Sequence, residues 1–402
     1  MKIINLYIAF ILFSTGCSGQ TPEYKIPSQV PWSQRIAESF ILRHTGSVTY
    51  DSGSPNRKWN YEQGIMLFAL YQMWLFSGDE KYFQFIRENL DQYIDESGNI
   101  RTYSLTDYNL DNIAPGRVLL KLYAKTGNEK YMLAADRLFR QLKEQPRTKE
   151  GGFWHKKIYP FQMWLDGLYM AQPFYAEYAS MKKDTLAFND IANQFIFIAN
   201  HTLDTATGLY YHGWDESKKE KWSNPRTGTS PSFWSRSMGW FIMGLVDVLD
   251  YFPPEHQKRD SLIKILNNLA ESLLRYMDKN TGMWYQVMNE QNREGNYLET
   301  SASCMFAYAF AKGANSGYLD ERFFDISQST FKGIIKNHVV FRGDGLIDLL
   351  GTCKSAGLGG NPYRNGSYEY YISEPKRVND MKGIAPFLLT AIELEKRNKL
   401  KN

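Results

Sequence analysis

One short stretch of the sequence, "GGFWHKKIYPFQMWLDG" at residues 151–167, combines aromatic rings with groups that can transfer protons. Asp166 stands near the end of this stretch, after Trp154, His155 and Trp164. Tryptophans around an aspartate would exclude water from it, and an apolar environment favours the protonated form of a carboxyl, as a general acid requires. The ordinary role of an aspartate before a helix is an N-cap. The pattern therefore predicts either an acid catalyst or a helix cap at Asp166.

A second carboxyl, Asp111, stands in a comparable position in the stretch "NLDNIAPG" at residues 109–116. It too precedes an apolar helix-like segment, so an N-cap is again the alternative. Two carboxyls that face each other closely force one of them to hold a proton. We expect Asp111 to face Asp166 in this way. A conventional inverting glycosidase also uses two carboxyls, and sequence spacing does not separate the two reactions.

Further polar and aromatic residues accompany these carboxyls at junctions along the chain. Arg236 is framed by two tryptophans, where a guanidinium either stacks as part of the core or binds a carboxylate with two hydrogen bonds. The histidines are either buried structural residues or ligand contacts. Aromatic rings can cover the apolar face of a pyranose while polar groups bind its edge, so the combination suits an acidic sugar. The candidate binding residues are Tyr61, His155, Lys156, Trp164, His212, Trp234, Arg236 and Trp240.

These junctions lie just before long apolar segments with helical periodicity. The segments begin at Tyr61, Asp111, Asp166, Ser235, Glu299 and Asp380, at separations of 50, 55, 69, 64 and 81 residues. Such a drifting period is typical of helix hairpins with variable loops, and hairpins of this kind must stack to bury their apolar faces.

Six inner and six outer helices, with residues 33–44 as the twelfth, predict an all-α fold, an (α/α)6 toroid with short strand-like segments between repeats. An open solenoid is the alternative. In a toroid the loops that lead into the inner helices converge at one mouth, so the candidate residues would face one cavity.

The N-terminus has the pattern of an export signal. Lys2 is followed by the apolar run Ile3 to Phe13 and by small residues before Cys17. This pattern resembles a bacterial lipoprotein signal, and we expect lipidation of Cys17, attachment to a membrane, and a location in the periplasm or at the outer membrane. Ser14 departs from that signal, which leaves cleavage by ordinary signal peptidase open. We expect a signal over residues 1–17, a linker over 18–30 and a single catalytic domain over 31–399.

The composition excludes several other classes of function. Basic residues are scattered, the formal net charge is +4, and no nucleic-acid motif is present. Cys304 and Cys353 are too few for a disulfide framework and read as buried thiols. The six histidines are dispersed and lack zinc spacing, so no zinc site is expected.

The motifs taken together resemble those of glycoside hydrolase family 105, the unsaturated rhamnogalacturonyl hydrolases and their relatives. The resemblance rests on "LDNIAPGR", "MWLDGLYMAQPFYAEYA", "YYHGWD", "WSRSMGW" and "GNPYRNGSYEYYISEPKRVNDMKGIAPFLL", in this order over most of residues 30–398. Family 88, the unsaturated glucuronyl hydrolases, shares the toroid and the paired aspartates and is the nearest competitor.

The resemblance implies an unusual reaction on lyase-generated oligosaccharides. Enzymes of the family hydrate the C4=C5 double bond of the uronic acid at the non-reducing end, and the product then releases the neighbouring sugar. Asp166 matches the proton donor, Asp111 the partner carboxyl, and the binding residues named above match the pocket. The resemblance implies neither a metal nor an organic cofactor. The expected substrate is an unsaturated galacturonyl- or glucuronyl-rhamnose. A conventional inverting glycosidase and a non-catalytic glycan-binding lipoprotein are the alternatives.

Overall fold

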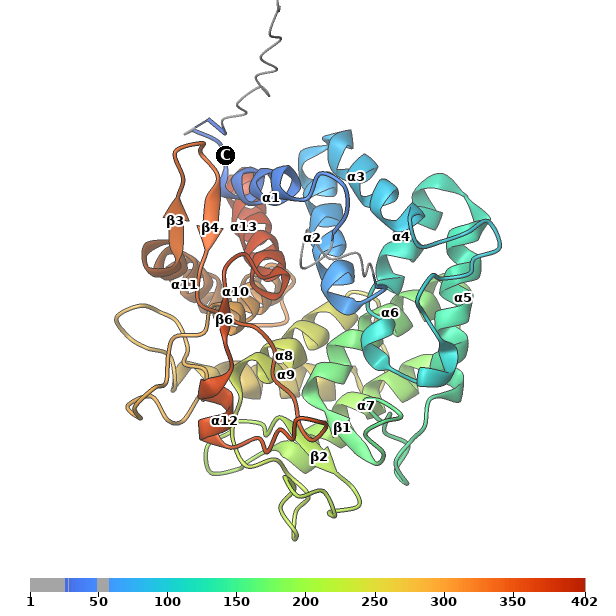
Figure 1. Ribbon diagram of the computed structural model, residues 1–402, viewed down its shortest axis with the longest axis vertical. Coiled ribbons are helices and arrows are strands. Elements are labelled where there is room, and N and C mark those ends of the chain that lie inside the picture. The colour runs from blue at the N-terminus through green and yellow to red at the C-terminus, as the bar shows by residue number, and fades with distance from the viewer. Residues whose placement is uncertain (1–25, 28, 49–57, 402) are drawn as a thin grey trace, which may run out of the picture.

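A computed structural model describes residues 26–401, with the exception of residue 28 and residues 49–57. Its helices alternate between an inner and an outer ring (Figure 1). The inner helices are α2 (Tyr61–Ser77), α4 (Gly116–Thr126), α6 (Leu165–Lys182), α8 (Ser235–Val248), α10 (Thr300–Asn315) and α13 (Met381–Lys401). The outer helices are α1 (Trp32–Arg43), α3 (Glu80–Asp91), α5 (Glu129–Glu144), α7 (Ala187–Thr202), α9 (Arg259–Leu274) and α11 (Arg322–His338).

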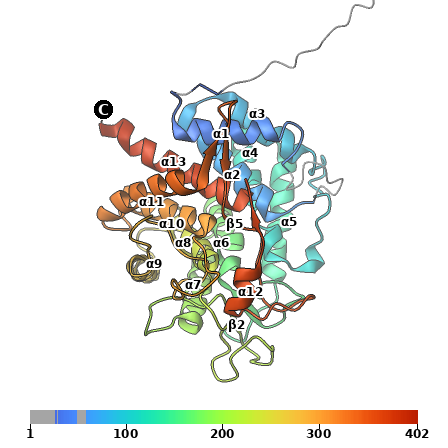
Figure 2. The same ribbon diagram turned by 60° about the vertical axis from the view of Figure 1, so that its left-hand side comes forward.

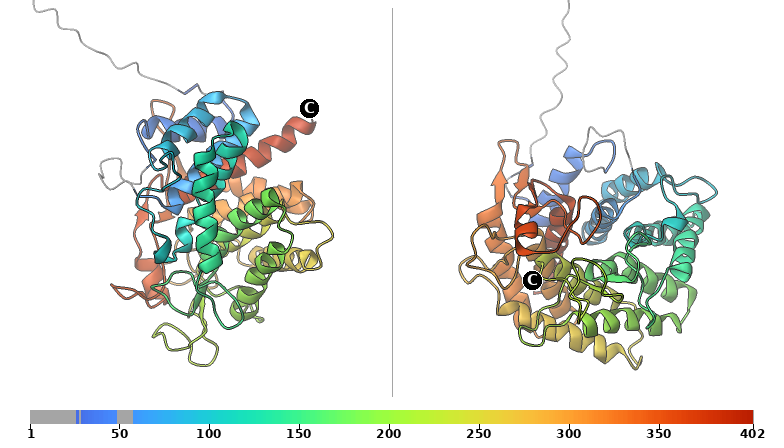
Figure 3. Two further views of the ribbon diagram at one scale, coloured as in Figure 1. Left: turned by 90° about the vertical axis from the view of Figure 1, so that its right-hand side faces the viewer. Right: turned by 60° about the horizontal axis from the view of Figure 1, so that its bottom comes forward.

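The inner ring closes on itself. Each inner helix packs against the next along the chain, and α13 packs against both α10 and α2. The outer helix of the last pair is α1, so the two ends of the chain meet at one seam, as Figure 1 shows beside the C-terminus. The end-on view in Figure 3 shows the helix pairs following one another around the ring. The expected (α/α)6 toroid is confirmed, and the open solenoid is excluded by the closure.

Short turns with the same residue pattern join the two helices within each of the first two hairpins. Gly78 and Gly127 end α2 and α4 in the left-handed conformation, with φ of 72° and 67°. A glycine adopts that conformation without the steric cost that a Cβ brings. Asp79 and Asn128 follow directly, and each side chain caps the next helix by accepting a backbone N–H. These local signals are why the helix boundaries could be predicted.

The helices α6, α8 and α10 are buried along almost their whole length, because outer helices cover one side and neighbouring inner helices the other. Their sequences are accordingly apolar around most of the circumference, as expected for helices inside a large core. The outer helices α3 and α5 instead alternate buried apolar residues with exposed charged ones. Cys304 and Cys353 are free and buried, as the sequence suggested.

Small antiparallel sheets and a short helix lie in the connections that lead into the inner helices. The six strands are β1 (Gln162–Trp164), β2 (Gly213–Asp215), β3 (Val339–Phe341), β4 (Ile347–Leu349), β5 (Thr352–Cys353) and β6 (Lys376–Arg377), paired β1–β2, β3–β4 and β5–β6. The helix α12 (Tyr368–Ser373) lies beside β2 in two different views (Figures 1 and 2). These connections come together at the end of the ring where the inner helices begin.

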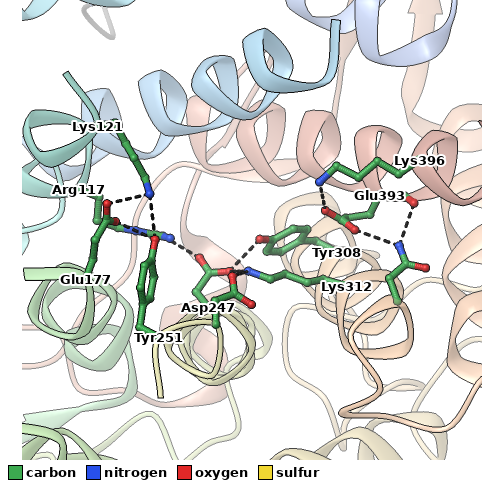
Figure 4. Close-up of polar contacts among 11 residues, drawn as sticks. Arg117, Lys121, Glu177, Asp247, Tyr251, Tyr308, Lys312, Glu393 and Lys396 are labelled. Atoms are coloured by element: carbon green, nitrogen blue, oxygen red, sulfur yellow. Dashed lines mark hydrogen bonds and ion pairs between the residues drawn. The ribbon is translucent and has the colours of Figure 1, made fainter. Parts of the chain in front are cut away.

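A network of buried charges occupies the inner helices away from that end (Figure 4). Asp247, near the C-terminal end of α8, is fully buried and lies 2.7 Å from both Arg117 Nη1 and Lys312 Nζ. Tyr308 donates a hydrogen bond to the same carboxylate at 2.8 Å. Because Arg117, Asp247 and Lys312 come from α4, α8 and α10, the network ties three inner helices together.

Candidate active site

A cavity of about 240 Å³ opens where the inner helices begin. Nine of the ten candidate residues line it, and His212 lies directly behind Asp166. Those that line it are Tyr61, Asp111, His155, Lys156, Trp164, Asp166, Trp234, Arg236 and Trp240. Residues from four separate helix pairs therefore meet in one place, as the convergence of the loops requires.

Backbone pairing between two loops positions Asp111. Asn109 pairs with Lys156 in an antiparallel bridge, and the Leu110 amide donates to the His155 carbonyl at 3.1 Å. This pairing sets Lys156 Nζ 2.5 Å from an Asp111 oxygen. Burial alone would raise the pKa of Asp111, but the Lys156 ammonium lowers the pKa below its ordinary value. Asp111 is therefore a carboxylate in the free enzyme.

A second pairing places Asp166 against His212. In the β1–β2 sheet Trp164 is opposite Gly213, and the Leu165 amide donates to the His212 carbonyl at 3.0 Å. As a result His212 Nε2 lies 3.1 Å from Asp166 Oδ2, and both residues are at least nine-tenths buried. These two atoms are not aligned for a hydrogen bond, and neither of them forms a hydrogen bond with any other atom in the described part of the chain.

Neither aspartate is an N-cap, so that alternative is wrong for both. Asp166 is the second residue of α6, whose N-cap is Trp164, and no side chain caps this helix. Asp111 lies in a 3-10 turn over residues 110–112, ahead of α4. Both carboxyl groups are free of the helix-capping role and line the cavity.

Trp164 forms the aromatic wall of the cavity. The rings of His155 and Tyr159 stack on it with centroids 4.5 and 4.9 Å away. The Trp164 indole N–H donates to the side-chain Oε1 of the buried Gln162 at 3.0 Å, which fixes the orientation of the indole. A Cβ at Gly167 would lie 3.0 Å from His155 Nδ1, so the glycine after Asp166 permits this close approach.

One expectation about this stretch was wrong. Trp154 does not line the cavity but packs against Phe161, with ring centroids 4.7 Å apart. His155 does line the cavity but is uncharged at neutral pH, because burial lowers its pKa to about 4. The Lys156 charge is balanced by Asp111. The cationic character of the cavity therefore comes mainly from arginine.

Arg236 lies deep in the cavity wall and is only 1% exposed. Its guanidinium packs over the Trp234 ring and donates through Nη1 to the Cys353 carbonyl and, at 3.3 Å, to the Ser301 hydroxyl. Although burial alone would lower the pKa of Arg236, Cys353 and Glu299 raise it overall, so the charge is retained. Its Nε has no hydrogen-bond partner in the described part of the chain. Arg236 thus lines the cavity and has a donor that none of the described residues uses.

Sequence reasoning missed several residues of the site, namely Tyr159, Met170, Ser355, Ala356, Arg364 and Tyr371. Arg364 donates to Tyr159 Oη at 2.7 Å and to the Gly359 carbonyl at 2.8 Å. It has no carboxylate partner among the described residues. The motif "NPYRNGSYEYY" at 361–371 contained the signal, since it carries an arginine among four tyrosines and two asparagines, away from the repeat positions.

Neither a metal site nor a membrane span is found within the described residues. No group of three or more histidine, cysteine, aspartate or glutamate side chains there could hold a metal ion. None of the helices in that part is long and apolar enough to cross a membrane. The expected signal over residues 1–17, Cys17 included, lies outside the described residues.

Known proteins share both the sequence pattern and the fold. A family model described as Glycosyl Hydrolase Family 88 matches residues 32–398. A family 105 glycoside hydrolase of C. acetobutylicum is 43% identical, with 91% of this chain and 100% of that chain covered and a TM-score of 0.87. The unsaturated rhamnogalacturonyl hydrolase YesR of Bacillus subtilis is 25% identical over 257 residues, which are 62% of this chain and 70% of the relative.

A third relative covers more of this chain than YesR does, at lower identity. The unsaturated 3S-rhamnoglycuronyl hydrolase of Alteromonas sp. is 20% identical over 374 residues, which are 84% of this chain and 88% of the relative. The match to the C. acetobutylicum structure, by contrast, covers 91% of this chain. The chain is a glycoside hydrolase that belongs to family 105, within the group that the family 88 model describes.

Proposed function

We propose that this enzyme removes the unsaturated uronic acid from the non-reducing end of lyase-generated oligosaccharides by adding water across its C4=C5 double bond. The observation that carries the proposal is the placement of Asp166 beside His212 in a cavity that also presents the Arg236 guanidinium. One group can donate a proton, and the other can hold the uronate carboxylate. Family membership favours this reaction over non-catalytic glycan binding.

In the proposed reaction Asp166 gives its proton to C4, and water adds its oxygen to C5. The proton that this water loses returns to the Asp166 carboxylate, so the enzyme ends in its starting state. The new C5 hemiketal opens to a ketone, and the hemiacetal thereby formed at C1 releases the neighbouring sugar with its hydroxyl. General acid–base catalysis of this kind contributes typically about 10²–10⁴-fold.

The other residues have separate roles in this proposal. Arg236 binds the uronate carboxylate through charge-assisted hydrogen bonds, and Trp164 and Trp240 flank the sugar ring. Asp111, held ionised by Lys156, stabilises positive charge that develops at C5 when C4 is protonated. Tyr61, whose pKa burial raises, remains a neutral hydrogen-bond donor at the wall.

The names of the relatives narrow the substrate class. YesR is an unsaturated rhamnogalacturonyl hydrolase, and the Alteromonas relative is an unsaturated 3S-rhamnoglycuronyl hydrolase. Both names join an unsaturated uronic acid to rhamnose. We therefore propose an unsaturated galacturonyl- or glucuronyl-rhamnose as the substrate, met after export of the protein as the leader sequence suggests.

A panel of disaccharides tests the proposal. Unsaturated galacturonyl- and glucuronyl-rhamnose, their methyl esters and their saturated counterparts are incubated with the enzyme, and the near-ultraviolet absorbance of the conjugated double bond is followed. Loss of absorbance together with release of rhamnose is expected for the unsaturated free acids alone. Release of sugar from the saturated uronides would support a conventional inverting glycosidase, in which the ionised Asp111 would be the general base.

A further inference from the structure

The hydroxyl of Tyr371 contacts the side of His212 that faces away from Asp166. Tyr371 Oη lies 2.7 Å from His212 Nδ1, and His212 Nε2 lies 3.1 Å from Asp166 Oδ2. Tyr371 and His212 are fully buried, so bulk water does not compete for these contacts. A tyrosine, a histidine and the proposed proton donor are thus arranged in one row, although 205 residues separate Asp166 from Tyr371 (371 minus 166).

The Tyr371 ring is held rigidly. It stacks on Trp234 with centroids 5.7 Å apart and an interplanar angle of 12°. Gln286 bonds both partners, because its Nε2 donates to the Tyr371 carbonyl at 3.0 Å and its Oε1 accepts from the Trp234 indole at 3.1 Å. The direction of the Tyr371 hydroxyl is therefore set by packing as well as by His212.

The direction of the Tyr371–His212 hydrogen bond decides where the imidazole proton sits. Burial raises the pKa of Tyr371, so its hydroxyl keeps a hydrogen that needs an acceptor. Within the described part of the chain, the partner of this hydroxyl is His212 Nδ1. A buried hydroxyl that accepted from Nδ1–H would leave its own hydrogen unpaired, which is unfavourable. Tyr371 therefore donates, Nδ1 accepts, and the ring proton of His212 is on Nε2.

We propose that Tyr371 is a positioning residue for the reaction, which fixes His212 in the Nε2–H form and thereby leaves Asp166 Oδ2 to act only as an acceptor. The proton of Asp166 then resides on Oδ1. Oδ2 is buried, whereas the side chain of Asp166 remains 12% exposed toward the cavity. The acid thus presents its proton on the oxygen that faces the substrate. After transfer, the positive end of the Nε2–H dipole, 3.1 Å from Oδ2 although off the line of a hydrogen bond, stabilises the carboxylate electrostatically. This proposal rests on the proposed function of Asp166.

The test combines spectroscopy of the free enzyme with kinetics. Protein labelled with ¹⁵N-histidine reports which ring nitrogen of His212 is protonated, with the resonance assigned by its absence in His212→Gln. Tyr371→Phe keeps the ring that stacks on Trp234 and removes only the hydroxyl. The matched control is Tyr368→Phe on the same short helix, whose hydroxyl donates to the Arg293 and Glu294 carbonyls instead.

In the wild-type enzyme and in Tyr368→Phe we expect His212 to carry its proton on Nε2. In Tyr371→Phe we expect a mixture of both tautomers, a fall in kcat of about 10- to 100-fold, as is typical when the outer partner that orients a histidine is removed, and little change in KM. A wild-type His212 protonated on Nδ1, or a Tyr371→Phe enzyme with unchanged tautomer and kcat, would overturn the proposal. The tautomer is measured without substrate, so failure of the proposed reaction is seen separately, in the disaccharide panel.

Discussion

The carboxyl of Asp166 lies 3.1 Å from the Nε2 atom of His212, and both side chains are buried at the end of the ring where the inner helices begin. Their proximity follows from the register of the β1–β2 sheet, in which Trp164 is opposite Gly213. His212 directly precedes that strand and Asp166 directly follows the first residue of α6. Two different helix pairs thus contribute the proposed acid, Asp166, and the histidine beside it.

The Asp111–Lys156 contact leads to a prediction about pH dependence. Lys156 lowers the pKa of Asp111, so Asp111 stays ionised at more acidic pH than an ordinary aspartate. Since the proposed reaction needs this carboxylate, activity should fall only when the pH drops through the lowered pKa. Lys156→Met removes the ammonium, and burial then raises the pKa of Asp111. The acid limb of kcat/KM against pH should move to higher pH, while a limb that stays in place would contradict the assignment.

The unused donor of Arg236 leads to a prediction about substrate charge. Charge-assisted hydrogen bonds contribute about 1.5–3 kcal/mol, so Arg236→Ala should lower kcat/KM for the unsaturated free acid by about tenfold or more. The methyl ester should be a poor substrate for the wild-type enzyme and should lose much less on the substitution. Equal losses on acid and ester would show that Arg236 acts through structure alone.

Arg364 supplies a comparison for that experiment. It lines the same cavity but bonds only Tyr159 and backbone carbonyls in the described part of the chain. If Arg236 holds the uronate carboxylate, Arg364→Gln should discriminate less than Arg236→Ala between the acid and its ester. The two variants measured side by side show which guanidinium binds the carboxylate.

The charge network around Asp247 leads to a prediction about stability. Asp247→Asn would leave Arg117 and Lys312 buried without their common counter-ion, which typically costs about 3–5 kcal/mol. Asp250→Asn is the matched control, because Asp250 also contacts Lys312 but is 38% exposed, and exposed pairs contribute about 1 kcal/mol or less. Denaturant unfolding of both variants at neutral pH checks this difference, and equal losses would contradict it.

The same aspartate predicts how stability changes in acid. Burial alone would raise the pKa of Asp247, but Lys312 and Arg117 lower it to about 2 in the folded protein, against 3.8 ordinarily. The contribution to the free energy of unfolding is therefore complete above about pH 4 and is lost as pH falls toward 2. Asp247→Asn should show a smaller loss of stability than the wild type over that interval.

Much of the fold could be predicted because its signals are local. The glycine at the end of α2 and the aspartate that caps α3 adjoin each other in the sequence, and Gly127 and Asn128 repeat the pattern. The starts of the inner helices were predicted instead from the onset of apolar helical periodicity, since α4, α6 and α8 have no side-chain cap. Since a closed ring brings these starts together, the candidate residues of the cavity followed from the fold.

The rest of the site depends on contacts that no local signal encodes. Arg364 and Tyr371 reach the cavity because the segment after β5 returns across it, held where Cys353 accepts from Arg236. Trp154 was misplaced because neighbouring side chains in extended backbone point to opposite sides, so His155 faces the cavity and Trp154 packs on Phe161. The neutral state of His155 arises from burial by distant segments.

Deuterium labelling shows whether Asp166 protonates C4 of the alkene. The unsaturated disaccharide is turned over in deuterated water by the wild-type enzyme and by Asp166→Asn, which keeps the size of the side chain but removes the acid. We predict one deuterium at C4, placed on a single face at early times, and a rate at least about 10²–10⁴-fold lower in the variant. Unlabelled C4 in the released product, or wild-type turnover by Asp166→Asn, would contradict it.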